Sequence, residues 1–221
     1  MPCIIERTVY KFDEPSDKAK ERARDAYRDH DLHYDWWDAV YEQAVEAAEV
    51  LGITIDTKPV TLRNGNVRLD PRIYFSGFCS QGDGASFEGR YSPRSGSEAV
   101  DQIANEFVTD SELHRIAEQL ALLQVSTRLK HGRLLEATIK LGGSGYYHSH
   151  TMDVDITYVD EEDGVSPDIK DDAELTRLMR AFADWIYSQL KAENDYLTSD
   201  EHIDEFFSDS TYEFEESGAL I

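Results

Sequence analysis

The sequence predicts an α+β fold, in which helices pack on a central antiparallel sheet and an acidic helical segment lies near the C-terminus. Three observations support this fold class. Segments rich in β-branched and aromatic residues occupy the middle of the chain, glycine-rich turns join some of them directly, and amphipathic helical patterns lie on either side. Of the 221 residues 40% are hydrophobic, which is enough for a packed core despite a formal net charge of −23.

The clearest helical pattern covers residues 35–51, where apolar residues recur every three or four positions and Gly52 supplies a stop. Residues 17–29 have few apolar positions, so we expect that helix to lie on the surface. The expected helices are 17–29, 35–51, two consecutive ones within 97–124, 173–193 and a short final one after Thr198. The expected N-caps are Ser16, Asp35 and, in capping-box pairs with Glu112 and Glu201, Thr109 and Thr198.

Strand patterns begin with a short opening strand predicted at 4–12, where the assignment depends mainly on the strand-forming residue types. Further strands are predicted at 53–56 and within 60–91. Residues 134–141 and 146–159 predict a β-hairpin around four turn residues, because their side chains alternate between polar and apolar. We expect the last ten or so residues to form a loose tail.

Two domains are predicted, a single α+β domain over residues 1–197 and an acidic helical extension and tail over 198–221. No apolar run approaches the roughly 18 residues that span a bilayer, and the N-terminus does not resemble a signal peptide. Cys3 and Cys79 form neither a disulfide framework nor a metal motif, which favours reduced thiols. We therefore expect a cytoplasmic protein without a membrane partner.

The negative charge is concentrated in residues 153–216. This segment has 21 Asp or Glu against four Lys or Arg, a net charge of −17, so the rest of the chain accounts for −6. Such a segment repels nucleic acid and anionic lipid, and it attracts a basic protein surface or cations. The expected partner is therefore a basic protein, with no direct binding of nucleic acid.

The C-terminal acids have a spacing that can imitate a nucleic acid. Acids four residues apart, such as Asp200 with Asp204 and Glu201 with Glu205, share one helix face. Double-stranded DNA carries one charge per roughly 1.7 Å of axis, so a dense carboxylate row can compete for its binding cleft. The alternative is a solvated surface that only keeps the protein soluble. The expected partner-binding residues are Asp160, Glu161, Glu162, Asp163, Asp200, Glu201, Asp204, Glu205, Asp209, Glu213, Glu215 and Glu216.

A glycine-rich loop provides the second candidate site. Its residues Ser80, Gln81, Gly82, Asp83 and Gly84 can bring backbone N–H groups close to an anion, although they match no phosphate-binding motif. The alternative function is therefore a small enzyme or ligand-binding domain centred on residues 76–87, with a histidine nearby. The competing interpretation is a hairpin turn in which Asp83 bonds to the local backbone.

Evidence for metal or catalytic chemistry is weak. His148 and His150 share one face of the predicted strand, but alternation places Asp153 and Asp155 on the opposite face. Surface histidines are the simpler interpretation. The sequence has no Gly-X-Ser-X-Gly elbow, no calcium-loop spacing and no cysteine in a catalytic motif. We expect no catalytic residue, no metal and no cofactor.

The block Tyr74-Phe75-Ser76-Gly77-Phe78-Cys79-Ser80-Gln81-Gly82-Asp83-Gly84-Ala85-Ser86-Phe87 resembles a family of uncharacterised phage and prophage proteins, some loosely labelled antitoxin-like. The resemblance covers mainly residues 70–91. It implies a phage or mobile-element origin and, by analogy, an inhibitor of a host or defence nucleic-acid-binding complex, as anti-CRISPR proteins are. The sequence therefore predicts a non-enzymatic acidic protein that blocks such a complex by DNA mimicry.

Overall fold

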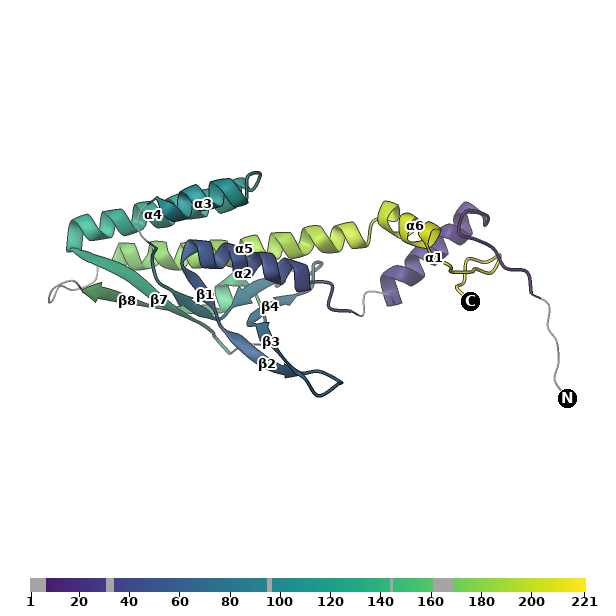
Figure 1. Ribbon diagram of the computed structural model, residues 1–221, viewed down its shortest axis with the longest axis horizontal. Coiled ribbons are helices and arrows are strands. Elements are labelled where there is room, and N and C mark those ends of the chain that lie inside the picture. Colours follow the sequence, from purple (N-terminus) through teal and green to yellow (C-terminus); the bar gives the residue numbers. More distant parts are fainter. Residues whose placement is uncertain (1–6, 31–33, 95–96, 144, 161–168) are drawn as a thin grey trace. The chain divides into compact units, whose positions relative to one another are not determined.

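The computed structural model describes residues 7–30, 34–94, 97–143, 145–160 and 169–221 (Figure 1). Its contacts form two compact units, one of residues 39–190 and one of residues 1–38 with 191–221. We call them the larger and the smaller unit and describe each by itself. Because a grouping by contacts does not test independent folding, the division into 1–197 and 198–221 stays a prediction.

The larger unit confirms the α+β class. A four-stranded antiparallel sheet has the strand order β1-β6-β7-β8, and two antiparallel hairpins, β2–β3 and β4–β5, accompany it. Its longest pairing joins β7 to β8, from Arg133 opposite Asp160 to Leu141 opposite Met152. The strands are β1 Ile53–Ile55, β2 Thr57–Thr61, β3 Val67–Pro71, β4 Ile73–Ser76, β5 Gly84–Phe87, β6 Gly89–Tyr91, β7 Arg133–Leu141 and β8 Met152–Asp160.

A three-way junction connects the sheet to the two hairpins. Asp56, Arg72 and Glu88 each lie between two consecutive strands that belong to different sheets. The Asp56 N–H donates to the Glu88 carbonyl at 2.9 Å, Glu88 N–H to Arg72 at 3.0 Å and Arg72 N–H to Asp56 at 2.7 Å. The chain therefore passes from one sheet to the next at three bends in one place, from β1 to β2, β3 to β4 and β5 to β6, without leaving these backbone N–H groups unsatisfied.

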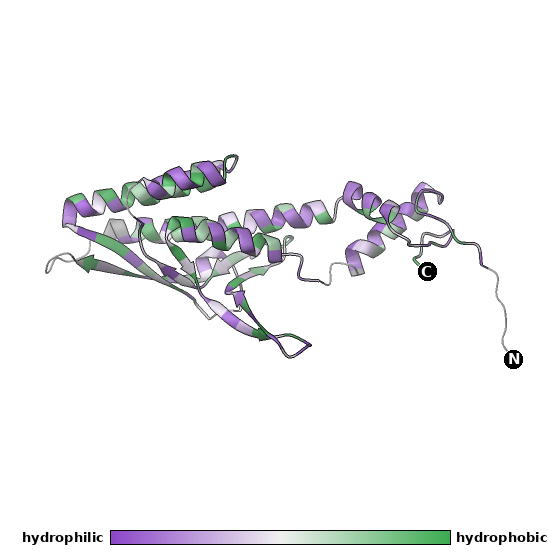
Figure 2. Cartoon of the chain, in the orientation of Figure 1, coloured by the Kyte–Doolittle hydropathy of each residue, from purple (hydrophilic) through white to green (hydrophobic). Residues whose placement is uncertain are grey.

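Helices cover one face of the sheet in the larger unit, as Figure 1 shows for α2 and α4. Leu135, Ala137 and Ile139 of β7 point inward and are at most 4% exposed, whereas β8 exposes Asp153 and Asp155. Figure 2 shows the same alternation of apolar and polar residues along the strands. The helices here are α2 Asp38–Leu51, α3 Glu98–Glu106, α4 Ser111–His131 and α5 Ile169–Leu197, the last with residues in both units.

Several predicted boundaries are wrong by one or more residues. Asp110 caps α4 in place of Thr109, and its carboxylate accepts from Leu113 N–H at 2.9 Å. Ser199 caps α6 (Asp200–Asp209) in place of Thr198, and its hydroxyl accepts from His202 N–H at 3.2 Å. Asp and Ser compete well for these positions, so neighbouring cap residues are hard to distinguish from sequence.

The predicted second strand of the hairpin begins too early. Residues Ser149–Thr151 form a short 3₁₀ helix, η1, and β8 starts only at Met152. His148 caps η1, because its Nδ1 accepts from the His150 N–H at 3.0 Å. Local side-chain hydrogen bonding therefore overrides the alternating pattern, and the two histidines do not share a strand face.

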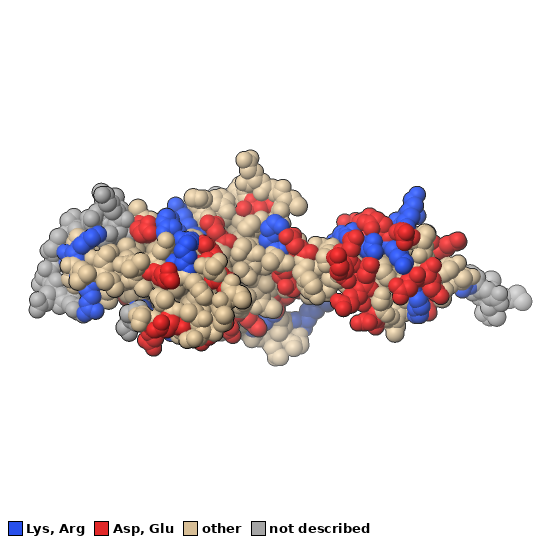
Figure 3. Space-filling view, turned by 90° about the horizontal axis from the view of Figure 1, so that it is seen from above, with Lys and Arg blue, Asp and Glu red and all other residues tan. Residues whose placement is uncertain are grey.

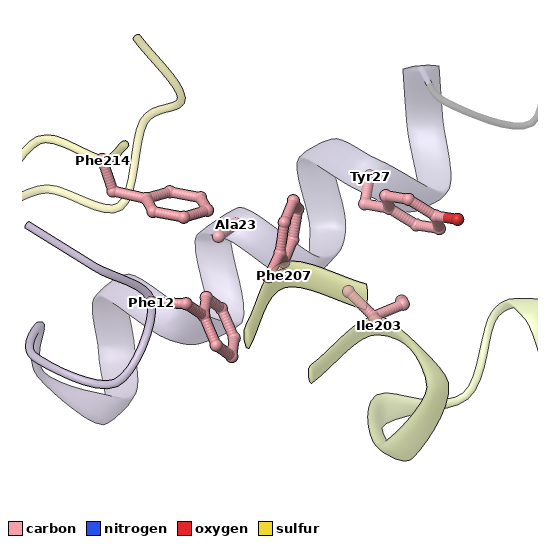
Figure 4. Packing of buried hydrophobic residues seen from close by; sticks show 6 residues of the cluster. All are labelled: Phe12, Ala23, Tyr27, Ile203, Phe207 and Phe214. Atoms are coloured by element: carbon pink, nitrogen blue, oxygen red, sulfur yellow. The ribbon is translucent and has the colours of Figure 1, made fainter. Parts of the chain in front are cut away.

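The smaller unit is built around α1 (Asp17–His30) and α6. One apolar cluster holds it together: Phe12, Ala23, Tyr27, Ile203, Phe207 and Phe214, each at most 4% exposed (Figure 4). The Phe207 ring lies 5.2 Å from the ring of Phe12 and 5.0 Å from that of Phe214. As expected, α1 lies on the surface with most of its described residues exposed, and it buries one narrow seam of Ala19, Ala23 and Tyr27, which are four residues apart.

The expected loose tail is wrong. Phe214 is 1% exposed and bridges both Tyr10 and Leu220 by antiparallel backbone pairing. Of the predicted strand 4–12, residues 4–6 lie outside the described residues, and Tyr10 forms only this isolated bridge. In the described parts of the chain, every helix is too short or too polar to cross a membrane.

We predict that Phe214→Ala destabilises the smaller unit by about 3 to 5 kcal/mol, the usual cost of removing a buried phenyl ring. Hydrogen exchange of α1 and α6 should then accelerate by about a hundredfold or more. Leu220→Ala, at a side chain that is 46% exposed, is the control and should change little. Equal exchange in the two variants would restore the loose-tail interpretation.

Candidate functional site

The acidic face of the smaller unit is organised by ion pairs between α1 and α6. Ile203 and Phe207 turn the buried side of α6 toward α1, which brings Asp200 and Asp204 next to two arginines. Arg24 donates to Asp204 through Nε at 2.6 Å and through Nη2 at 2.7 Å, a bidentate arrangement. Arg28 pairs with Asp200 and also donates to the Thr198 carbonyl at 3.1 Å.

These pairs neutralise half of the predicted carboxylate row. The Arg24 side chain is only 17% exposed, and the hydrogen bond to Asp204 raises its pKa although burial acts in the opposite direction. A bidentate pair with a largely buried arginine side chain gives a fixed geometry. Asp200 and Asp204 therefore stabilise the contact of the two helices, and their charge is not available to a partner in full.

Two further predicted acids are paired in the same way. Glu213 lies 3.8 Å from the Lys11 ammonium, and Glu215 pairs with Arg7. All four side chains are about half exposed, so each pair contributes little to stability, on the order of 1 kcal/mol at most. The pairs nevertheless reduce the net charge of this end of the chain.

The remaining acids of α6 form an exposed stripe. Glu201, Glu205 and Asp209 are spaced four residues apart, are exposed, and make no ion pair with any residue that the structure describes. Glu216 is exposed as well. Figure 3 shows how Asp and Glu cover much of one face of the smaller unit, with Lys and Arg between them. Only part of the predicted row is therefore free to meet a partner.

A groove beside the stripe combines carboxylates with aromatic rings. It measures about 400 Å³ and is lined by Tyr196, His202, Glu205, Phe206, Asp209 and Ser210. The Tyr196 side chain is 54% exposed and Phe206 is 36% exposed, and the rings of Tyr196 and His202 lie 4.7 Å apart. Carboxylates next to aromatic faces suit a guanidinium or ammonium group, by ion pairing and cation–π attraction.

The other predicted acidic segment is only partly described. Asp160 ends β8, and its side chain is not described. Glu161, Glu162 and Asp163 lie outside the described residues. Their role in partner binding therefore stays a prediction.

The glycine loop joins β4 to β5 as a turn that Asp83 closes from within. The Asp83 carboxylate accepts from the backbone N–H groups of Cys79 at 2.8 Å and of Ser80 at 2.6 Å. This is the hairpin interpretation, in which Asp83 bonds to its own loop. Since His148 likewise bonds to local backbone, neither group is directed at a shared ligand.

Aromatic stacking attaches this loop to α5. The Phe78 ring lies 5.5 Å from Tyr187 and 5.7 Å from Phe75, and the Tyr187 hydroxyl donates to the Gly77 carbonyl at 3.1 Å. Tyr187 lies outside the block of residues 74–87. The sequence did not predict its contact with this block, because a tyrosine on a helix has no distinguishing local signal. Most residues of the block thus have structural roles, which leaves Cys79, Ser80, Gln81 and Gly82 exposed at the tip.

The carboxylates with shifted pKa values are unsuited to general acid catalysis. Burial raises the pKa of Glu88, but hydrogen bonds, chiefly from Arg72 at 2.7 Å, outweigh this effect and hold it below its ordinary value. Hydrogen bonds from Arg115 and Arg177 likewise lower the pKa values of Glu112 and Glu174. A general acid at neutral pH needs a raised pKa, so these three groups act as ion-pair partners.

The histidines near η1 do not form a metal site with other residues that the structure describes. Within the described ranges, no three His, Cys, Asp or Glu side chains converge as metal ligands would. His148 and His150 have rings 6.0 Å apart, but they lie in the turn around η1 and gain no third ligand there. The described residues therefore support no metal proposal.

The chain belongs to the family described as Domain of unknown function (DUF8835), which matches residues 36–200. This range contains the larger unit, the glycine loop and all of α5. The exposed stripe from Glu201 onward lies just beyond it. Comparison with curated proteins found no match, and comparison with solved structures found none either.

We predict that Gly84→Ala and Gly82→Ala have different effects on stability. A Cβ at Gly84 would lie 2.5 Å from the His148 Cβ, whereas a Cβ at Gly82 would meet nothing within 4 Å. Overpacking should make Gly84→Ala about 1 to 3 kcal/mol less stable in denaturant unfolding. Gly82→Ala should stay within about 0.5 kcal/mol of the native chain. Equal effects would contradict the close packing of the loop on residue 148.

Proposed function

We propose that this is a non-enzymatic, acidic protein of phage type that binds a basic protein surface and inhibits a nucleic-acid-binding complex by occupying its nucleic-acid site. The observation that carries the proposal is the exposed stripe of Glu201, Glu205 and Asp209 beside the aromatic groove. The stripe differs from its neighbours Asp200 and Asp204, because arginines of α1 already hold those two.

The spacing of the carboxylates in the stripe fits a partner site that normally binds the phosphates of a nucleic acid. Residues four apart on a helix are separated by about 6 Å along its axis, or just under two base-pair steps of about 3.4 Å. A row of arginines or lysines that binds phosphates can therefore form ion pairs with successive carboxylates of α6. Tyr196 and Phe206 add faces on which a guanidinium can stack, as it does on a base.

The overall charge of the smaller unit supports the same partner. By sequence the unit contains 20 acidic and 8 basic residues, whereas the longer larger unit contains 25 and 14. A strongly negative field accelerates the encounter with a basic protein, and salt weakens that effect. The phage character depends on the resemblance of residues 74–87 and not on the charge.

The alternative function at residues 76–87 has lost its main support. It needed Gln81, Asp83 and a histidine to converge, but Asp83 and His148 both bond to local backbone. Among the described residues, no observation favours an enzyme centred on this loop.

We predict that the triple variant Glu201→Gln, Glu205→Gln, Asp209→Asn binds an arginine-rich peptide about tenfold more weakly, as expected for three exposed ion pairs. Calorimetry with nona-arginine at low and at raised salt measures this, and capture from host lysate tests the natural partner. Affinity for the native chain should fall with salt.

The matched control removes three exposed acids from another helix. Glu42, Glu46 and Glu49 lie along the exposed side of α2, so their conversion to Gln changes the net charge by the same amount. This variant should retain most of the affinity. Equal weakening by both variants, or binding that does not change with salt, would contradict a specific electrostatic site on α6.

A further inference from the structure

Helix α4 has apolar residues on two faces. Its inner face buries Leu113, Ile116, Ala117, Leu120 and Leu123. Its outer face exposes Leu122 by 68%, Val125 by 51% and Leu129 by 82%. An amphipathic helix of a single folded unit needs only one apolar stripe, so the second is a surface suited to a partner.

The exposed residues form one continuous stripe. Positions 122, 125 and 129 are spaced three and four residues apart, so their side chains lie above one another on the helix. Figure 2 shows the apolar segments along α4. A hollow of about 240 Å³ adjoins the stripe, and Ala121, Val125 and Arg128 contribute to its lining. The outer face therefore offers both projecting side chains and a recess.

We propose that the occupant is the α4 helix of a second copy of this chain, packed antiparallel around a two-fold axis near Val125. This arrangement places Leu122 of one copy beside Leu129 of the other, which maximises the overlap of two identical apolar stripes. Self-complementary contacts of this kind are the rule in two-fold dimers. The inference is independent of the proposed function, which concerns α6.

The charges of α4 favour the antiparallel direction. Glu118 lies in its first half, where Arg115 already pairs with Glu112, and Arg128 and Lys130 lie in its last turns. Antiparallel packing brings Glu118 of one helix toward the basic end of the other, whereas parallel packing would align like charges. With two acids and three bases, α4 is also a segment where two chains of net charge −23 repel one another little.

The expected dimer depends on concentration. A single pair of helices buries less than the roughly 800 Å² per partner of a standard stable interface. Sedimentation velocity of the full chain across a concentration series should therefore show a monomer–dimer equilibrium. A monomer at every concentration would overturn the proposal and assign the apolar outer face of α4 to a different kind of protein partner.

A charge-exchange pair tests the arrangement. Leu122→Glu and Leu129→Lys should each shift the equilibrium to monomer, since either places a charge in the apolar contact. Mixing the two variants should restore a heterodimer, because an antiparallel pair sets the introduced carboxylate of one chain against the introduced ammonium of the other. The second contact, between the native Leu129 of the first variant and the native Leu122 of the other, stays intact. Parallel packing would give no such restoration and would overturn this model of the interface.

The control substitution is Val67→Glu on β3, where the native side chain is 62% exposed. It introduces the same negative charge as Leu122→Glu but far from α4 in sequence, and it should leave the dimer unchanged. Circular dichroism should show native-like folding for all of these variants, because each changes an exposed side chain. A dimer that persists in both Leu122→Glu and Leu129→Lys would place the interface elsewhere.

Discussion

The cyclic backbone junction of Asp56, Arg72 and Glu88 is the constraint on which the larger unit depends. Each residue links two sheets, so the three bends must occur in one place for the four-stranded sheet and both hairpins to form. Gly89 follows directly, where a Cβ would lie 2.2 Å from the Thr54 carbonyl oxygen, so β6 can approach β1 only with a glycine there. The junction thereby also sets the start of the β4–β5 hairpin, which carries the glycine loop to α5.

In the smaller unit, a different interaction decides which charges can act on a partner. The aromatic cluster around Phe207 packs α6 on α1, and that packing places Arg24 and Arg28 beside Asp200 and Asp204. Carboxylates on one side of α6 thus hold the fold, while Glu201, Glu205 and Asp209 on another side face solvent. Helix α6 can therefore stabilise the fold with the acids that face α1 and leave its other acids in solvent, where a partner can reach them.

Local pattern was a good guide where the deciding interactions are short in range. The apolar spacing of α2, the pairing of β7 with β8 and the turn formed by Asp83 all follow from residues close in sequence. The errors have physical causes as well. The His148 side chain accepts from a backbone N–H, so β8 starts later than the alternation predicts. Neighbouring polar residues compete for two helix N-caps. Phe214 packs in an aromatic cluster with residues far away in sequence, which no local pattern shows.

By itself, the sequence determined the α+β class, most helices and the concentration of negative charge toward the C-terminus, because periodicity and composition act within a few residues. Only the tertiary structure decided which acids are neutralised. Arg24 lies 180 positions from Asp204 in the chain, yet the two form a bidentate pair. Burial of Phe12, Tyr27 and Phe207 brings them together, and no spacing within either segment encodes that meeting. The exposed stripe of α6 and the apolar outer face of α4 are likewise products of packing, since exposure depends on what the rest of the chain leaves uncovered.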